Sequence, residues 1–163
     1  YLNHTCYNGL YRLNKRGQFN VPYGRYKNPK YCDEENLLAV SRALMNVDVL
    51  CCSFEEALQL ARPGDFVYCD PPYIPISKTS SFTSYTSEGF TLTDHENLRN
   101  YILGLTMKNV RIMLTNSDTD VTKNLYNIPY FQIYRLQTKR LINCNSKRRA
   151  NYINELLIIN YHI

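Results

Sequence analysis

The apolar run Phe66–Cys69 stops at Asp70-Pro71-Pro72-Tyr73, and this boundary constrains the fold more than any other feature of the sequence. The run follows a Pro63-Gly64 turn and is rich in β-forming residues, so it predicts a buried strand. Proline cannot continue a central strand, so the strand should end at Asp70. The two prolines also restrict their neighbours, which predicts a stiff extended loop. In open α/β sheets, ligands bind beyond the carboxyl ends of the strands, where this loop would lie.

The chemistry of this loop suits an amino group on a planar ring. Asp70 and the Pro71 carbonyl can accept hydrogen bonds from an exocyclic amine, while Tyr73 stacks on the ring. The amine nitrogen can then attack an activated methyl group directly, with no covalent enzyme intermediate. The alternative interpretation is an ordinary turn after a strand, because Asp-Pro and Pro-Pro are common loop dipeptides.

Alternating strand and helix patterns predict an α/β fold with a mainly parallel sheet and an antiparallel terminal hairpin. The expected strands are Val47–Cys52, Phe66–Cys69, Val110–Thr115, Phe131–Leu136 and Glu155–Tyr161. The expected helices are Glu34–Asn46 with Asp33 as its cap, Glu55–Leu60, a helix from a Thr93/Glu96 capping box to Lys108, and Thr119–Tyr126. Residues 74–90 are rich in Ser and Thr and predict a mobile lid or substrate loop with Phe82, Tyr85 and Phe90 as anchors.

Charge is unevenly distributed along the chain. Residues 1–32 carry six Lys or Arg and no acid, residues 33–120 carry six against thirteen acids, and residues 121–163 carry seven against Glu155 alone. The three blocks have net charges of +6, −7 and +6. Basic ends favour a polyanion, and an acidic middle favours a small cationic cofactor. Tyrosines among the first basic residues suit base stacking, although solvated basic loops are the alternative.

Several segments together carry a family resemblance. They are residues 66–77, then Phe82-Thr83-Ser84-Tyr85 and Gly89-Phe90-Thr91-Leu92, and near the start Cys6-Tyr7-Asn8-Gly9-Leu10 with Arg12 and the segment 17–26. The later segments resemble the catalytic region, and the earlier ones the target-recognition region, of Dam-type (D12 class) site-specific DNA adenine methyltransferases. The resemblance implies methyl transfer from S-adenosylmethionine to the amino group of adenine in double-stranded DNA, with GATC as the expected target.

The same resemblance implies roles for individual residues. Asp70, Pro71, Pro72 and Tyr73 match the catalytic loop, and Asp70 also lies at the expected cofactor site. Ser53 and Phe54 match a pair that borders the cofactor adenine, although a capping serine beside a core phenylalanine explains them equally well. The expected DNA contacts are base readout by Arg12, phosphate contacts by Asn8 and Arg25, and contacts to a thymine methyl or the gap of a flipped base by Leu10, Pro22 and Tyr26.

One feature of the resembled family is missing from this chain. A glycine-rich loop normally holds the amino-acid end of the cofactor, but the six glycines here form no Gly-x-Gly cluster. We therefore expect the carboxyl-terminal portion of a longer enzyme, with an incomplete Rossmann-like sheet and a loop or hairpin recognition arm. Residues 1–32 would end the target-recognition region and residues 33–163 would form the catalytic region. The alternatives are an inert DNA-binding remnant and an amino-methyltransferase acting on RNA or protein.

The remaining composition argues for an ordinary cytoplasmic protein. No apolar run approaches the roughly 20 residues that cross a membrane, and no secretory leader pattern is present, so we expect no membrane partner. The six cysteines lack Cys-x-x-Cys spacing and predict buried, reduced thiols. His4, His95 and His162 are too dispersed for a triad or a metal site. We expect a monomer without metal. Lys147-Arg148-Arg149 is either a phosphate-binding patch or a solvated turn.

Overall fold

The computed structural model describes residues 1–76, 89–139 and 152–162. Residues Tyr1–Leu50 belong to one compact unit, and the described residues from Cys51 onward belong to a second. The two units are described separately below. The expected lid anchors Phe82 and Tyr85 and the basic run Lys147-Arg148-Arg149 lie outside the described residues.

The first unit begins with an irregular segment that is held together by a few backbone contacts. A short helix, α1 (Leu2–Thr5), and a 3₁₀ turn, η1 (Tyr7–Gly9), open the chain. Residues 12–20 then form a hairpin, in which Leu13 pairs antiparallel with Phe19. A second antiparallel bridge joins Cys6 to Tyr23. The expectation of a loop or hairpin in this region is confirmed, whereas α1 was not anticipated.

Helix α2 (Glu34–Ala43) follows, with the 3₁₀ turn η2 (Leu44–Asn46) at its end. The Asp33 carboxylate accepts a hydrogen bond from the Asn36 amide, which confirms the predicted cap. The strand predicted at Val47–Cys52 is wrong, because these residues have extended or irregular backbone without a ladder. A strand exists only when a neighbour pairs with it, and no described segment pairs here. Val49 is 78% exposed as a result.

The second unit is built on a four-stranded sheet of order β1-β2-β4-β3. Its strands are β1 (Phe66–Cys69), β2 (Arg111–Ser117), β3 (Gln132–Lys139) and β4 (Tyr152–Ile159). Strands β1 and β2 are parallel, while β2 with β4 and β3 with β4 are antiparallel. The predicted terminal hairpin is confirmed as β3 and β4. The prediction of a mainly parallel sheet is wrong for the described strands, because β4 runs back between β2 and β3.

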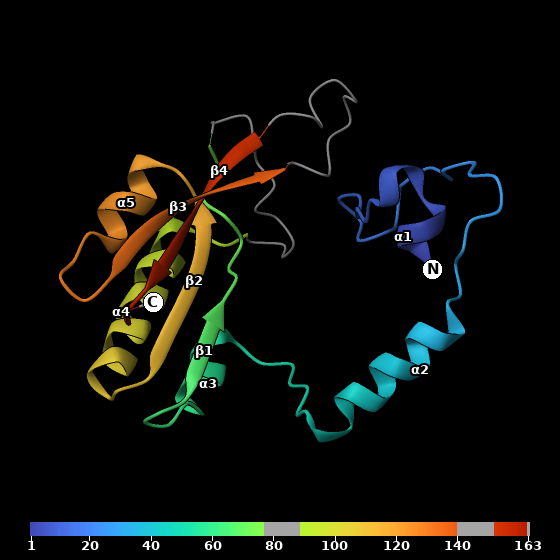
Figure 1. The fold of residues 1–163 in the computed structure, drawn as a ribbon. Helices are drawn as coiled ribbons and strands as arrows, with labels where there is room; N and C mark the ends of the chain where they lie inside the picture. Colours follow the sequence, from blue (N-terminus) through green and yellow to red (C-terminus); the bar gives the residue numbers. More distant parts are fainter. Residues whose placement is uncertain (77–88, 140–151, 163) are drawn as a thin grey trace. The chain divides into compact units, whose positions relative to one another are not determined.

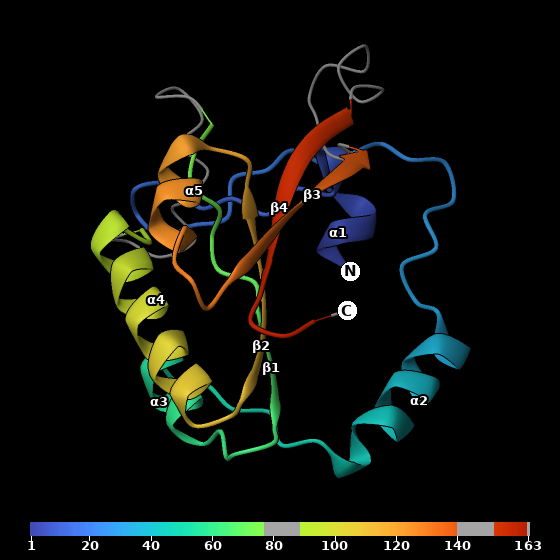
Figure 2. The same ribbon diagram turned by 60° about the vertical axis from the view of Figure 1, so that its left-hand side comes forward.

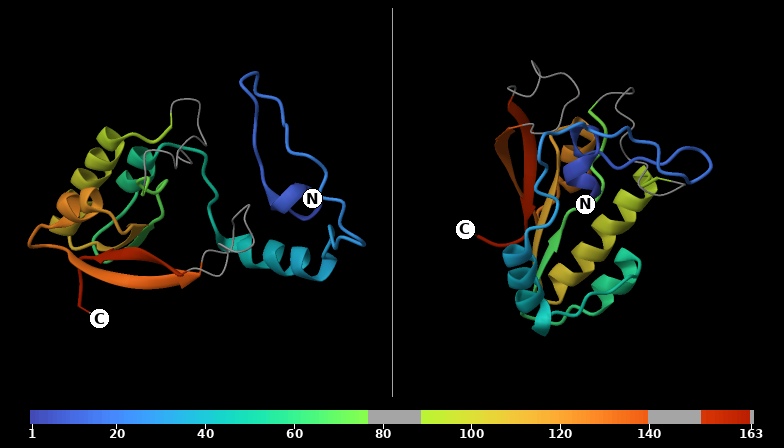
Figure 3. Two further views of the ribbon diagram at one scale, coloured as in Figure 1. Left: turned by 90° about the horizontal axis from the view of Figure 1, so that it is seen from above. Right: turned by 90° about the vertical axis from the view of Figure 1, so that its right-hand side faces the viewer.

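Three helices lie on one face of this sheet, as Figure 1 and the turned views in Figure 2 and Figure 3 show. They are α3 (Phe54–Gln59), α4 (Leu92–Met107) and α5 (Asp120–Tyr126). The core forms where they meet β2 and β4, and its buried members are Leu58, Leu98, Ile102, Leu105, Val110, Ile112, Leu114, Tyr126, Phe131, Leu156 and Ile158. Strand β1 lies at the sheet edge among the described strands, and its Phe66 and Tyr68 are exposed. The predicted bounds of this strand are confirmed, and Val67 and Cys69 are half-buried, but the expected burial is wrong for Phe66 and Tyr68.

The helices of this unit begin at side-chain caps. Ser53 and Glu56 form a reciprocal capping box at α3, and Thr119 caps α5. Helix α4 begins at a capping box of Thr91 and Asp94, not at the predicted box of Thr93 and Glu96. The sequence offers both frames two residues apart. In the frame that forms, the Thr91 and Asp94 side chains each accept a hydrogen bond from the backbone amide of the other.

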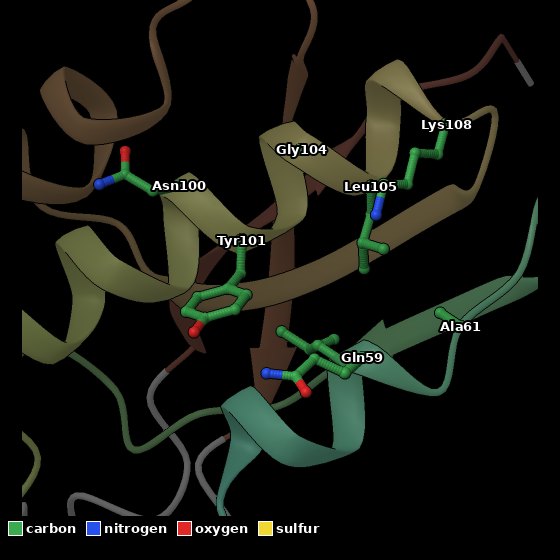
Figure 4. A pocket seen from close by; sticks show the side chains of 8 residues that line it. Gln59, Ala61, Asn100, Tyr101, Gly104, Leu105 and Lys108 are labelled. Carbon is green, nitrogen blue, oxygen red and sulfur yellow. The ribbon is translucent and has the colours of Figure 1, made fainter.

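A hollow lies between α3 and α4, as Figure 4 shows. It is lined by Leu58, Gln59, Ala61, Asn100, Tyr101, Gly104, Leu105 and Lys108. Lys108 closes α4 beside the start of β1, because the next residue, Asn109, accepts a hydrogen bond from the Gly64 amide. This end of the sheet is opposite to Asp70. The Lys108 end of the hollow is therefore distant from the loop that the sequence marks as catalytic, whereas its Tyr101 meets Phe54.

Gly104 provides a test of this packing. A Cβ at Gly104 would meet no atom within 4 Å, and glycine inside a helix loses more backbone entropy on folding than alanine. Gly104→Ala should therefore raise the free energy of unfolding by about 0.5–1 kcal/mol in urea denaturation. Gly64→Ala is the matched control, because Gly64 also has open space but a φ of +92°. It should destabilise the chain, and equal effects from both variants would contradict this account.

Candidate active site at the end of strand β1

The loop Asp70-Pro71-Pro72-Tyr73 leaves β1 beside the end of β2. The parallel register pairs Cys69 with Leu114, so Asp70 lies next to Thr115 at the carboxyl ends of the two strands. The Thr115 hydroxyl donates a hydrogen bond of 2.9 Å to Asp70 Oδ1. The Tyr68 hydroxyl lies 3.1 Å from the same Thr115 oxygen. The sequence prediction of a carboxylate at a strand end is confirmed, and the structure adds a hydroxyl contact that holds it.

Asn116 holds the far end of the same loop. Its side-chain oxygen accepts hydrogen bonds from the amide of Ile74 at 2.9 Å and from the amide of Ser117 at 2.8 Å. The Asn116 side chain is 0% exposed. Because Thr115 and Asn116 are consecutive in a strand, their side chains point to opposite faces of the sheet. Two neighbouring residues of β2 therefore hold the first and last parts of the loop.

His95 supports the loop from helix α4. Its ring is 2% exposed and meets Phe90 edge to face, with ring centroids 4.7 Å apart. Burial lowers the pKa of His95, and the nearby Asp94 carboxylate and Pro72 carbonyl oppose this effect only in part. Neither ring nitrogen has a hydrogen bond of good geometry within the described residues, so Pro72 is a neighbour and not a firm partner. Burial thus keeps the imidazole of His95 neutral at a position next to Pro72.

Tyr73 is half-buried and remains neutral. Burial raises its pKa to about 12, with Glu155, Asp70 and Tyr68 acting in the same direction and the Thr115 hydroxyl against it. A neutral phenol ring next to Asp70 can stack on a planar group without repelling the carboxylate. Cys69 precedes the loop, and burial raises the pKa of its thiol to about 11. This cysteine therefore has little thiolate at neutral pH and is a poor nucleophile.

Ser53 and Phe54 have structural partners. Ser53 accepts a hydrogen bond from the Glu56 amide, and Glu56 accepts one from the Ser53 amide. The Phe54 ring meets Phe90 and Tyr101 edge to face, at centroid distances of 5.8 and 6.1 Å. Phe90 also meets His95, so Phe54 is connected to the loop through one aromatic ring. The capping serine and the core phenylalanine are both present, and their cofactor roles stay predictions.

The six expected DNA-contacting residues lie together in the first unit. Arg12 donates from Nε to the Asn20 side-chain oxygen at 2.9 Å and from Nη2 to the Asn20 carbonyl at 3.3 Å. Its guanidinium is exposed, as are Pro22, Arg25 and Tyr26, whereas Asn8 and Leu10 are half-buried. The amide of Asn8 donates to the Tyr26 hydroxyl at 3.1 Å.

Glycine at position 24 makes room for Tyr26. A Cβ at Gly24 would collide with the Tyr26 ring. Arg25, between them, has a φ of +54°, an uncommon conformation for a side-chain-bearing residue. Tyr26 thus shapes the turn, in addition to any contact with DNA.

Sequence reasoning missed Thr115, Asn116 and His95. Thr115 was recognised only as the last residue of a predicted strand, Asn116 as the residue after it, and His95 as one of three dispersed histidines. The available signal was positional, because polar residues at the end of a strand parallel to β1 lie at the edge where Asp70 lies.

The structure also bears on the expectations about metal ligands, membrane spans and cysteines. The described segments contain no group of three His, Cys, Asp or Glu side chains suited to a metal ion. No helix within the same segments is long and apolar enough to cross a membrane. Cys6 is buried and unpaired, but Cys32, Cys51 and Cys52 are exposed, so the expectation of buried thiols is wrong for these three.

Comparison with known proteins gives one consistent family. The family model for D12 class N6 adenine-specific DNA methyltransferase matches residues 1–142. The chain is 50% identical to the type II methyltransferase M.MjaIII of Methanocaldococcus jannaschii, over 99% of this chain and 55% of that protein. It is 44% identical to the type II methyltransferase M1.LlaDCHI of Lactococcus lactis subsp. cremoris, over 99% and 56%. It is 38% identical to a DNA adenine methylase of Serratia marcescens, over 98% and 58%. The chain therefore spans about half the length of these relatives.

The neutral state of His95 predicts a pH dependence of stability. An unfolded chain has an ordinary histidine pKa of about 6.5, and the folded chain a lower one. As the pH falls through about 6.5, the unfolded state binds the proton first, so the free energy of unfolding should decrease toward the folded pKa. The lowered carboxyl pKa values of Asp94 and Asp118 act at more acidic pH. Urea denaturation between about pH 7.5 and pH 5.5 measures the effect.

Substitution of His95 tests whether this residue causes the pH dependence of the free energy of unfolding. His95→Gln should flatten this decrease, because glutamine does not titrate. His4→Gln, at an exposed ring of the first unit, is the control and should retain it. An unchanged slope in His95→Gln would show that another group causes the pH dependence.

Proposed function

This chain belongs to the D12 class of N6 adenine-specific DNA methyltransferases, and we propose that its loop at the end of β1 transfers a methyl group from S-adenosylmethionine to the exocyclic amine of adenine in duplex DNA. The observation that carries the proposal is the Asp70 carboxylate, fixed by Thr115 beside the half-buried ring of Tyr73. A carboxylate next to a neutral aromatic ring suits an amino group on a planar base.

The donor set at this edge also fits the reactive end of the cofactor. The bound cofactor supplies an electrophilic methyl group on a sulfonium cation. The Asp70 carboxylate is the group of this chain that would face that positive charge, and Phe54 would offer a ring edge to the cofactor adenine. Ser53 could contribute its hydroxyl only while it also caps α3. No glycine-rich loop in this chain holds the amino-acid end.

The mechanism proceeds by positioning. The target adenine must leave the duplex, because its amino group cannot reach a closed pocket while the base is stacked. Asp70 and the Pro71 carbonyl then accept one hydrogen bond each from its two N–H groups, which orients the nitrogen lone pair and stabilises the positive charge that develops there. Tyr73 packs on the base. The carboxylate can also take the proton that the methylated amine loses.

The first unit would provide the recognition arm. Arg12 is the proposed base reader, since arginine is the usual bidentate partner of guanine, and Asn20 presents its guanidinium. Asn8 and Arg25 would contact phosphates, while Leu10, Pro22 and Tyr26 would meet a thymine methyl or the space of the flipped base. We propose GATC as the target, and an incomplete Rossmann-like sheet as the catalytic part.

A second candidate follows from the length of the chain. Because it spans about half of its relatives, it could bind DNA without binding the cofactor. Calorimetry with S-adenosylmethionine separates the two candidates, since a DNA-binding remnant should release no heat. An amino-methyltransferase acting on RNA or protein is separated by comparing substrates.

Asp70→Ala tests the catalytic role. Transfer of labelled methyl to a GATC duplex should fall to background, while affinity for the duplex should change by less than about twofold. Transfer is measured with this chain alone and with this chain joined to the unmatched remainder of the Methanocaldococcus jannaschii relative. The control is Asp120→Ala, because the Asp120 side chain is 96% exposed at the start of α5. An Asp70→Ala variant with half of the wild-type activity would refute the assignment.

Arg12→Ala tests the recognition role. Loss of a bidentate contact should weaken binding to GATC by about 1–3 kcal/mol and leave binding to a scrambled duplex nearly unchanged. Fluorescence anisotropy at one fixed salt concentration measures both. Arg16→Ala, at the exposed tip of the same hairpin, is the control and should weaken both duplexes equally. Equal losses from Arg12→Ala would make Arg12 a phosphate contact.

A further inference from the structure

Thr115 lies where it can control the direction of the Asp70 side chain. Along β2, Leu114 and Asn116 are buried toward the helices, while Met113 and Thr115 are half-buried on the other face. Thr115 follows the pair Cys69 and Leu114, so it is next to Asp70 in the parallel register. Its position is set by the backbone ladder and not by a flexible loop.

The donor and the acceptor can be assigned in the hydrogen bonds of the Thr115 hydroxyl. A threonine hydroxyl has one proton to donate, and Thr115 donates it to Asp70 Oδ1 at 2.9 Å. The Tyr68 hydroxyl is 3.1 Å from the same oxygen, so Tyr68 must be the donor in that pair. One chain of hydrogen bonds therefore runs from Tyr68 to Thr115 to Asp70. The Tyr73 hydroxyl also contacts the Thr115 hydroxyl, and because the Thr115 proton is used for Asp70, Tyr73 must likewise be the donor there. No other hydrogen bond to the Asp70 carboxylate is formed within residues 1–76, 89–139 and 152–162.

We propose that Thr115 is the positioning residue that fixes the direction of the Asp70 carboxylate, and that Tyr68 fixes the direction of the Thr115 hydroxyl. Thr115 occupies Oδ1 and leaves Oδ2 free to accept the amino group of the base. For methyl transfer this consequence rests on the proposed function. An Asp70 side chain free to exchange between χ1 rotamers would present its carboxylate to the amine in several positions, and small misplacements of a reacting group are costly.

Substitutions at residue 115 separate the hydroxyl from the shape of the side chain. Thr115→Val keeps the β-branched shape that suits a strand but has no hydroxyl. Thr115→Ser keeps the hydroxyl and loses the methyl group. Tyr68→Phe removes the second hydroxyl of the chain. Tyr134→Phe is the control, because it removes a tyrosine hydroxyl that bonds to Gln132 elsewhere in the sheet.

The direct measurement is the side-chain rotamer of Asp70 in solution. NMR three-bond couplings from the Asp70 backbone nitrogen to its carboxyl carbon report χ1 without requiring activity. Wild type and Thr115→Ser should show the couplings of one rotamer, and Thr115→Val should show averaged couplings. Tyr68→Phe should average them in part. Couplings in Thr115→Val equal to those of wild type would overturn the proposal.

The functional consequence is measured in single turnover on a GATC duplex. Loss of a hydrogen bond to a charged group predicts transfer that is about 10- to 100-fold slower in Thr115→Val, and about threefold slower in Tyr68→Phe. Affinity for DNA and for the cofactor should stay within about twofold, because neither variant removes a binding group. Rescue by Thr115→Ser distinguishes positioning from a general structural role.

The two measurements separate the possible failures. If wild type and all variants transfer no methyl group, both alone and joined to the unmatched remainder of the Methanocaldococcus jannaschii relative, the proposed function is refuted, while the couplings still decide whether Thr115 positions Asp70. If transfer occurs and Thr115→Val is as fast as Tyr134→Phe, the positioning proposal is refuted and the proposed function stands.

Discussion

The parallel pairing of β1 with β2 is the constraint on which the rest of the site depends. Its register brings the carboxyl ends of both strands to one edge of the sheet, so Asp70 meets Thr115 and the amide of Ile74 meets Asn116. An antiparallel neighbour would bring the other end of β2 next to Asp70, and neither Thr115 nor Asn116 could then reach the loop. The core under the helices fixes this register, because Ile112 and Leu114 must face α4.

Local signals predicted the elements that local interactions make. The Asp33 cap and the end of β1 at Asp70 are properties of short segments, and the structure contains both. The predicted terminal hairpin is also present, although its two strands pair across a longer stretch of sequence. Val47–Cys52 has the composition of a strand but no ladder, because pairing depends on residues far away in sequence. The same reason explains β1, since burial of an apolar run depends on what covers it.

The residues of the candidate site likewise divide into those that the sequence predicted and those that it did not. Asp70, Pro71, Pro72 and Tyr73 were predictable, because four adjacent residues specify both the end of a strand and its chemistry. Thr115, Asn116 and His95 were not, because each acts on the loop across more than 20 residues of sequence. A topology would have been needed first, since only the parallel register tells which polar residue faces Asp70.

The groups that support the loop share one property: none carries a charge near neutral pH. Thr115 and Asn116 are polar but cannot ionise, burial keeps His95 and Tyr73 neutral, and no cation pairs with Asp70 within the described segments. An arginine or lysine in place of Thr115 would also hold the carboxylate, but it would offset its negative charge. A hydroxyl fixes the direction of Asp70 and leaves that charge for a substrate nitrogen that becomes positive. Uncharged hydrogen-bonding partners therefore position the Asp70 carboxylate without offsetting its negative charge.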